Sequence, residues 1–214
     1  MTDSQRALIA VLLDRSGSME SIKSDTEGGF NAFITEQRKQ RLDIRVTLAQ
    51  FDTEYDVVFA NRPVADVPPL ELQPRGATAL YDAVGRLITD VGAELAALPE
   101  EQRPGRVTVV VLTDGHENSS KEWTHDAVRK AIHRQEREYS WDFVFLGANM
   151  DAVAIGQQLG FAADRSMTYA ADADGVGAAW AATSDYVVRR IAVPVGAPVA
   201  GFSEEDRAAA RGER

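Results

Sequence analysis

Three short segments of the sequence combine oxygen-bearing side chains in patterns that could hold a metal ion. The first is DRSGS, residues 14–18, which directly follows the apolar run ALIAVLL. The others are GATAL, residues 76–80, and TDGHENSS, residues 113–120. The candidate ligands are five side-chain oxygens with no nitrogen or sulfur, and they belong to Asp14, Ser16, Ser18, Thr78 and Asp114. Such a set is preferred by hard divalent cations, here Mg²⁺ or Mn²⁺.

These segments can meet only if a sheet brings them to one edge. Residues 7–13 and 106–113 are almost continuously apolar, which is typical of strands buried on both faces. The first and third segments follow directly on these two strands. In an open α/β sheet, ligands bind beyond the carboxyl ends of the strands, where the winding direction switches. We therefore expect both segments at the same edge, with Thr78 folding beside them.

Strand and helix patterns alternate along the rest of the chain. The short link between two β-branched runs predicts an antiparallel hairpin of residues 43–52 and 55–60. Apolar residues at helical or strand spacing predict helices over 21–40, 79–98, 123–139, 151–159 and 175–191, and strands over 141–149 and 166–170. This order predicts an α/β fold: a doubly wound, mostly parallel open sheet with one antiparallel edge strand and helices on both faces.

Several local expectations follow from residue types. The Gly28–Gly29 pair is expected to bend or loosen the first helix. Thr124 is suited to cap the helix over 123–139, and Thr78 could likewise cap the helix that follows it, with or without binding a metal. The residues after 193 are rich in Ala, Pro, Gly and charge. We therefore predict one domain over 6–192 and a flexible C-terminal tail over 193–214.

The composition argues against several kinds of site and partner. The 214 residues include no cysteine, which excludes disulfides, thiolate metal sites and a cysteine nucleophile. With 33 acidic and 23 basic residues the net charge is −10, which argues against nucleic-acid binding. No stretch approaches the roughly 18 apolar residues of a membrane span, and the N-terminal apolar run lacks a basic leader. We expect a cytoplasmic protein with neither a nucleic-acid nor a membrane partner.

The three segments resemble the ligand loops of the von Willebrand factor A domain, the fold shared with integrin I domains. The resemblance is carried by DRSGSM, GATALYDAV and VVVLTDGHEN in this order, and it extends over roughly residues 6–191. In that family the three loops build a metal-ion-dependent adhesion site. None of the five candidate positions departs from the family's pattern. The resemblance implies a stand-alone, bacterial-type member with an intact adhesion-site motif.

The same resemblance implies a role for each candidate residue. Ser16 and Ser18 would bind the cation directly, and Asp14 and Asp114 would bind it directly or through water. Thr78 would join the cation in a ligand-competent state. Because three of the five ligands are neutral hydroxyls, the cation would keep an electrophilic, open position. An Asp or Glu side chain of a protein partner would fill this position.

Two further hypotheses concern the surroundings of the site. Gly76 allows backbone movement, so Thr78 could alternate between direct and water-mediated coordination, as in the family, and thereby switch the affinity for the partner. His116 and Glu117 are expected to line the rim of the docking site. The other two histidines, His125 and His133, are expected to be solvated or capping residues and not metal ligands.

Alternatives remain for the segment DRSGS. Taken alone, it could be a strand-to-helix turn with capping hydroxyls. A Mg²⁺-dependent phosphohydrolase is a second possibility, but aspartyl-phosphate phosphatases need a second acid two residues after the nucleophile, where this chain has Ser16. The sequence has neither a G-x-S-x-G nucleophile elbow nor a phosphate-binding P-loop, so we expect no enzyme activity. A scaffold with an unoccupied site is the third possibility. The sequence does not indicate an oligomeric state.

Overall fold

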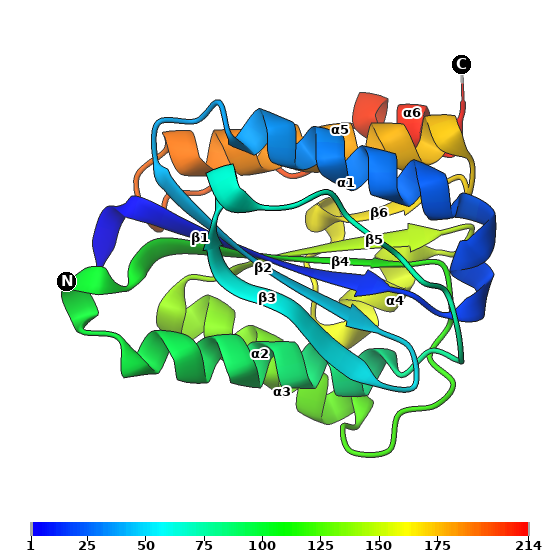
Figure 1. The fold of residues 1–214 in the computed structure, drawn as a ribbon, viewed down its shortest axis with the longest axis horizontal. Helices are drawn as coiled ribbons and strands as arrows, with labels where there is room; N and C mark the ends of the chain where they lie inside the picture. Colours follow the sequence, from blue (N-terminus) through cyan, green and yellow to red (C-terminus); the bar gives the residue numbers. More distant parts are fainter. Residues whose placement is uncertain (1, 214) are drawn as a thin grey trace.

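The strand that precedes the first candidate loop, β1 (Asp3–Asp14), is an interior strand of a six-stranded sheet in the computed structural model, which describes residues 2–213 (Figure 1). The other strands are β2 (Asp43–Phe51), β3 (Tyr55–Pro63), β4 (Pro104–Thr113), β5 (Asp142–Ala148) and β6 (Ser166–Tyr169). Their order across the sheet is β3-β2-β1-β4-β5-β6, and only the β2–β3 pair is antiparallel. The predicted mostly parallel sheet with one antiparallel edge strand is confirmed.

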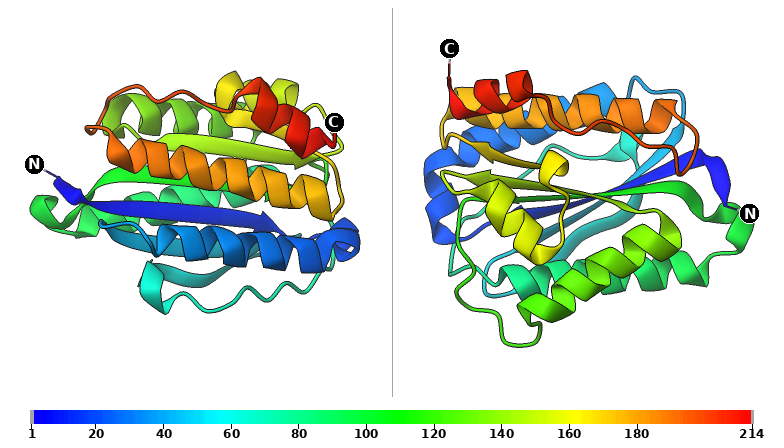
Figure 2. Two further views of the ribbon diagram at one scale, coloured as in Figure 1. Left: turned by 90° about the horizontal axis from the view of Figure 1, so that it is seen from above. Right: turned by 180° about the vertical axis from the view of Figure 1, so that it is seen from behind.

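Helices cover both faces of this sheet. They are α1 (Lys23–Gln37), α2 (Leu80–Ala97), α3 (His125–Tyr139), α4 (Ala152–Leu159), α5 (Ala173–Ala192) and α6 (Glu204–Arg211). Helices α1, α5 and α6 lie over one face, whereas α2, α3 and α4 lie over the other (Figures 1 and 2). None of the helices within residues 2–213 is both long enough and apolar enough to cross a membrane.

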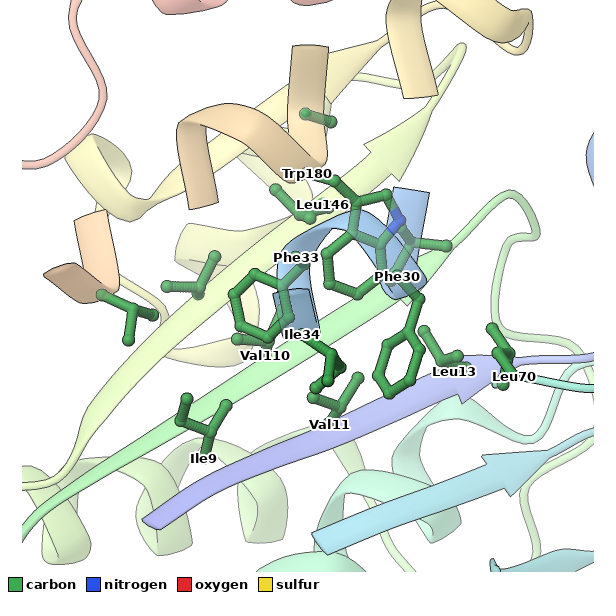
Figure 3. Close-up of a cluster of buried hydrophobic side chains, with 14 of the residues drawn as sticks. Ile9, Val11, Leu13, Phe30, Phe33, Ile34, Leu70, Val110, Leu146 and Trp180 are labelled. Atoms are coloured by element: carbon green, nitrogen blue, oxygen red, sulfur yellow. The ribbon is translucent and has the colours of Figure 1, made fainter. Parts of the chain in front are cut away.

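The continuous apolar run of β1 serves two cores. Successive side chains of a strand point to opposite faces of the sheet. The odd-numbered side chains from Ile9 to Leu13 therefore pack with α1 and α5 (Figure 3), and the even-numbered side chains from Leu8 to Leu12 pack under α2. This double burial fixes the position of the carboxyl end of β1, where Asp14 begins the first candidate loop.

The glycine pair in α1 serves helix packing and does not interrupt the helix. Helix α1 is continuous through Gly28 and Gly29, which differs from the expected bend or loosening. A Cβ atom at Gly29 would lie 2.2 Å from Cδ1 of Trp180 on α5, whereas a Cβ atom at Gly28 would have no neighbour within 4 Å. Trp180 also stacks edge-on against Phe30, with ring centroids 5.8 Å apart. Gly29 thus lets the indole ring approach the α1 backbone.

The segment after residue 193 contains an ordered helix, so the prediction of a flexible tail is wrong. Ser203 and Asp206 form a capping box at the start of α6, since each side chain accepts a hydrogen bond from the other residue's backbone N–H. Phe202 and Ala210 are buried in the core beneath α5. The guanidinium of Arg207 donates to backbone carbonyls in and just before β6. The segment looked flexible because of its charged composition, although it contains two buried apolar residues, Phe202 and Ala210, and a capping box.

Replacing Gly29 by Ala is expected to destabilise the protein by about 1–3 kcal/mol, because the new methyl group collides with Trp180 in a packed core. The matched change Gly28→Ala places a methyl group in open space and should stabilise the helix by about 0.5–1 kcal/mol. Urea denaturation of both variants measures the difference. Equal free energies of unfolding for the two variants would contradict the conclusion that position 29 must be glycine to accommodate Trp180.

Candidate metal centre

The first and third candidate loops leave the sheet side by side. Strands β1 and β4 are parallel neighbours, with Leu13 opposite Leu112 near their carboxyl ends. Asp14 ends β1, and Asp114 follows the last residue of β4. The chain winds from β1 outward through β2 and β3, and from β4 outward through β5 and β6 (Figure 1). The two loops therefore lie at the switch point of the sheet, as expected.

Four of the five predicted residues are linked by short polar contacts to one another or to the end of β4. The Oγ atoms of Ser16 and Ser18 lie 3.1 Å apart, and Ser18 Oγ donates to Asp114 Oδ1 at 2.7 Å. Asp14 accepts from the Ser16 backbone N–H and from the Thr113 hydroxyl, both at 2.6 Å. These contacts bring the ligands of the first and third loops into one cluster.

Thr78 completes the set from the second loop. A Cβ atom at Gly115 would lie 2.5 Å from Thr78 Oγ1 and 3.4 Å from Asp14 Oδ2, so all three groups share one small space. The backbone of Thr78 is tied to Asn118, whose side chain accepts its N–H at 2.9 Å and whose N–H donates to its carbonyl at 3.0 Å. The structure thus brings together all five predicted residues.

Thr78 does not cap the helix that follows it. Helix α2 begins at Leu80 with Ala79 as its N-cap residue, and its first free backbone N–H groups donate to side chains of the third loop, Tyr81 to Glu117 and Asp82 to Ser120. The proposed capping role of Thr78 is therefore wrong. By contrast, Thr124 caps α3 as predicted, because its side chain accepts from the N–H of Ala127.

A buried aspartate that the sequence did not single out holds the first two loops together. Asp52 follows β2, and its side chain is 1% exposed. Its Oδ2 accepts hydrogen bonds from Arg15 Nε in the first loop and from Arg75 Nε beside the second, each at 2.8 Å. The loops also pair through their backbones, from Arg75 N–H to Arg15 O and from Gly17 N–H to Gly76 O. We call Asp52, Arg15 and Arg75 the loop clamp.

The electrostatics of the clamp favour an ionised Asp52. Burial opposes ionisation, but hydrogen bonds from Arg75, from the Glu54 backbone N–H and from Arg15 outweigh it and lower the pKa of Asp52 below its usual value. Gly76 has φ +70°, a conformation that suits glycine. The second loop is thus held by ionic and backbone contacts at the point where movement of Thr78 was expected.

The two carboxylates of the site have no basic side chain paired with them among residues 2–213. Burial raises the pKa of Asp14 to about 6, against the hydrogen bonds from Thr113 and Ser16, and the nearby Asp114 adds to this rise. Burial also raises the pKa of Asp114, with Ser18 opposing. Within the described chain, neither carboxylate forms a salt bridge with a lysine, arginine or histidine. Two such groups at one place are costly to ionise without a positive charge.

The donor set fits a hard divalent cation. Neighbouring ligands of an octahedral ion, each about 2.1 Å from it, lie ~3 Å apart. The oxygens of Ser16, Ser18 and Asp114 have this spacing. Among residues 2–213, no three His, Cys, Asp or Glu side chains cluster so that they could hold a metal ion. Any cation at this place would therefore depend on hydroxyl ligands as much as on carboxylates.

The loop after Asp114 is ordered by its own polar residues. His116 and Glu117 line a cavity of about 190 Å³ with Tyr81 and Met150. The Glu117 carboxylate accepts hydrogen bonds from the backbone N–H groups of Tyr81 and of the two serines that follow Asn118. It therefore orders the third loop and joins it to the start of α2. Glu117 and Asn118 belong to the third segment, but their hydrogen-bond partners are visible only in the fold.

Comparison with known proteins identifies the fold and no more. No family model matches the sequence, and no curated protein matches it. Solved structures do match. The chain is 16% identical, at TM-score 0.59, to proximal thread matrix protein 1 from the mussel byssus with a zinc-occupied MIDAS motif, and the match covers 84% of this chain and 47% of that one.

Two other structures give the same result. The pilus adhesin SpaC from Lactobacillus rhamnosus GG is 16% identical at TM-score 0.64, with 86% of this chain and 31% of that chain covered. A von Willebrand factor type A protein from Catenulispora acidiphila is 14% identical at TM-score 0.58, with 86% and 43% covered. The chain spans less than half the length of these proteins. At this identity the likeness establishes a von Willebrand factor A-like fold.

Replacing Asp52 by Asn is expected to lower the free energy of unfolding at pH 7 by about 2 kcal/mol, because the clamp's hydrogen bonds to a charged group are lost. The pKa of Asp52 is lower in the folded state than in the unfolded chain. Its stabilisation is therefore fully present above about pH 4 and disappears as the pH falls through the folded-state pKa. The difference in the free energy of unfolding between Asp52→Asn and the wild type should therefore become smaller in acid.

The half-exposed Asp56, which also pairs with Arg15, provides the control. Asp56→Asn should cost about 0.5 kcal/mol at most. Urea denaturation at pH 7 and at about pH 3 measures both variants. The stabilising role of the loop clamp would be contradicted if the two substitutions lowered the free energy of unfolding equally. It would also be contradicted if the effect of Asp52→Asn did not change with pH.

Proposed function

We propose that this chain is a metal-dependent protein-interaction module. A divalent cation, Mg²⁺ or Mn²⁺, would be held by Asp14, Ser16, Ser18, Thr78 and Asp114, and an Asp or Glu side chain of a partner protein would complete its coordination. The observation that carries this proposal is the convergence of three hydroxyls on two carboxylates that have no cationic partner within residues 2–213. This is the composition of an adhesion site and not of a closed structural cage.

The balance of charge explains why such a site would bind a partner. Two carboxylates neutralise a doubly charged cation, and the serine and threonine hydroxyls add no charge. The bound ion would supply an electrophilic centre that attracts a further carboxylate. The chain's own residues hold the ligands in place, since Thr113 orients Asp14 and Asn118 fixes the backbone of Thr78. A partner that excludes water would strengthen the attraction.

The comparisons support the proposal at the level of the fold. One structural neighbour, the thread matrix protein, has a zinc-occupied MIDAS motif, and another is a pilus adhesin. By analogy, the site of this chain would take a divalent metal and engage another protein. The proposal also includes an intact adhesion site, residence in the cytoplasm and the absence of catalysis. The cysteine-free composition is compatible with a reducing compartment.

Removing two of the hydroxyl ligands tests metal binding directly. Wild-type protein should bind Mn²⁺ and Mg²⁺ at a single site by isothermal titration calorimetry, and the double variant Ser16→Ala/Ser18→Ala should bind at least ~100-fold more weakly, because two of five ligands are gone. The control is Thr35→Ala, which removes an exposed hydroxyl that donates within α1. A wild-type protein that gives no heat and no thermal shift with either ion would instead indicate a scaffold without a working site.

Partner capture tests the second half of the proposal. Proteins that bind the immobilised chain in Mg²⁺ should be released by EDTA, and an Asp114→Ala variant should capture none of them. A phosphoester incubated with the protein and Mg²⁺ should not be hydrolysed. Hydrolysis that disappears in Asp114→Ala would favour the phosphohydrolase alternative. Capture that is unchanged by EDTA would contradict a metal-bridged contact.

A further inference from the structure

A groove of about 420 Å³ lies at the edge of the sheet opposite the candidate metal centre. Its floor includes Trp141 and Asp142 at the start of β5, and one wall is the segment Gly196–Val199. Because β5 runs parallel to β4, its first residues lie at the far end of the sheet from Asp114. The wall belongs to the stretch that runs back from the end of α5 toward α6 (Figure 2). The groove is therefore separate from the proposed interaction site.

Arginines and carboxylates line this groove in equal number. Arg137, Arg165 and Arg190 line it, and a fourth, Arg106, lies beside it, where its guanidinium donates to the carbonyl of Val193. The lining carboxylates are three: Glu136, Asp142 and Asp164. With Arg106 beside it, the groove region holds four arginines against three carboxylates, in a chain whose net charge is −10.

Two of the three carboxylates are already hydrogen-bonded within the groove, and the third, Asp164, is exposed. Asp142 accepts from Arg190 Nε, from Arg165 Nη1 at 2.9 Å and from the hydroxyl of Tyr186 at 3.1 Å. Glu136 accepts from Arg165 Nη2 at 3.2 Å. These contacts use most of the acceptor capacity of the two half-buried carboxylates. The remaining N–H groups of the arginines therefore need acceptors other than these two carboxylates.

Two of the arginines retain unused donors. Arg190 is 3% exposed, and its Nη1 has no hydrogen-bond partner in the described part of the chain. Arg106 is 8% exposed; it donates only to backbone carbonyls, and its Nε is likewise without a partner among residues 2–213. Burial, and the positive charge of Arg190, lower the pKa of Arg106. Asp142 already pairs with Arg190, whereas Arg106 has no carboxylate partner among residues 2–213. An anion in the groove would add negative charge and acceptors next to these arginines.

We propose that this groove binds a small molecule through a carboxylate or phosphate group. Arg190 and Arg137, which line the groove, are the donors, and Arg106, bonded to the carbonyl of Val193, adds positive charge beside it. The planar guanidinium matches both kinds of oxyanion in two-point contacts. The volume of the groove lies within the range of small-molecule sites. Because the unpaired groups of the arginines are all hydrogen-bond donors, the groove favours a ligand with several acceptor oxygens.

The test titrates inorganic phosphate and succinate into the full chain at constant ionic strength, with chloride as the reference anion. Divalent cations are removed beforehand with a chelating resin, so that no cation at the candidate metal centre can bind the anion, and no EDTA is present because its carboxylates would compete for the groove. At ten times the dissociation constant, a binding anion should raise the melting temperature by about 3 °C. The indole N–H signal of Trp141 should shift in a ¹⁵N correlation spectrum, whereas those of Trp123 and Trp180 should not.

Matched variants on α3 decide whether the groove is responsible. Arg137→Gln should weaken binding at least tenfold, whereas Arg134→Gln, on the same helix but paired with Glu138, should bind as wild type does. Both residues are exposed, so both variants should fold. Arg190→Lys, which keeps the charge but loses the planar fork, should also bind more weakly. Absence of saturable binding by both anions, or equal affinity in Arg137→Gln and Arg134→Gln, would overturn the proposal.

Discussion

The structure depends on one electrostatic constraint: two carboxylates, the buried Asp14 and the half-buried Asp114, must be held together at the point where the sheet changes its winding direction. Parallel pairing of β1 with β4 makes this proximity unavoidable, because both strands end there. Burial raises the pKa of both groups, and no basic side chain among residues 2–213 pairs with either. A protein can accommodate such a pair by retaining protons or by binding a cation. The proposed function takes the second route, because the surrounding hydroxyls are ligands that suit a hard cation.

The rest of the scaffold limits how the three loops can move. Continuous burial on both faces fixes the end of β1, and the clamp at Asp52 joins the first loop to the second. Asn118 joins the second loop to the third through both polar groups of the Thr78 backbone. The ligands are therefore preorganised by contacts that do not involve a metal. In this arrangement, a switch at Thr78 would have to loosen the clamp or the Asn118 contacts.

The sequence predicted the features that arise from local pattern. Apolar runs identified the buried strands, and the three motifs identified all five residues that the structure brings together. Long-range packing was not accessible in the same way. Gly29 faces an indole ring some 150 residues later in the chain, and Asp52 has no motif, because its role depends on two arginines from different loops. The helix α6 was missed because its anchors, Phe202 and Ala210, are isolated among charged residues.

The most direct test of the account is crystallographic. Crystals grown with Mn²⁺ should show a single strong anomalous peak between the first and third loops, bonded to the hydroxyls of Ser16 and Ser18 and close to Asp114 and Thr78. One coordination position should be filled by water or by an acidic side chain from a neighbouring molecule. A crystal in which Mn²⁺ is absent from this cluster at saturating concentration, or is enclosed by protein ligands with no open position, would contradict the account.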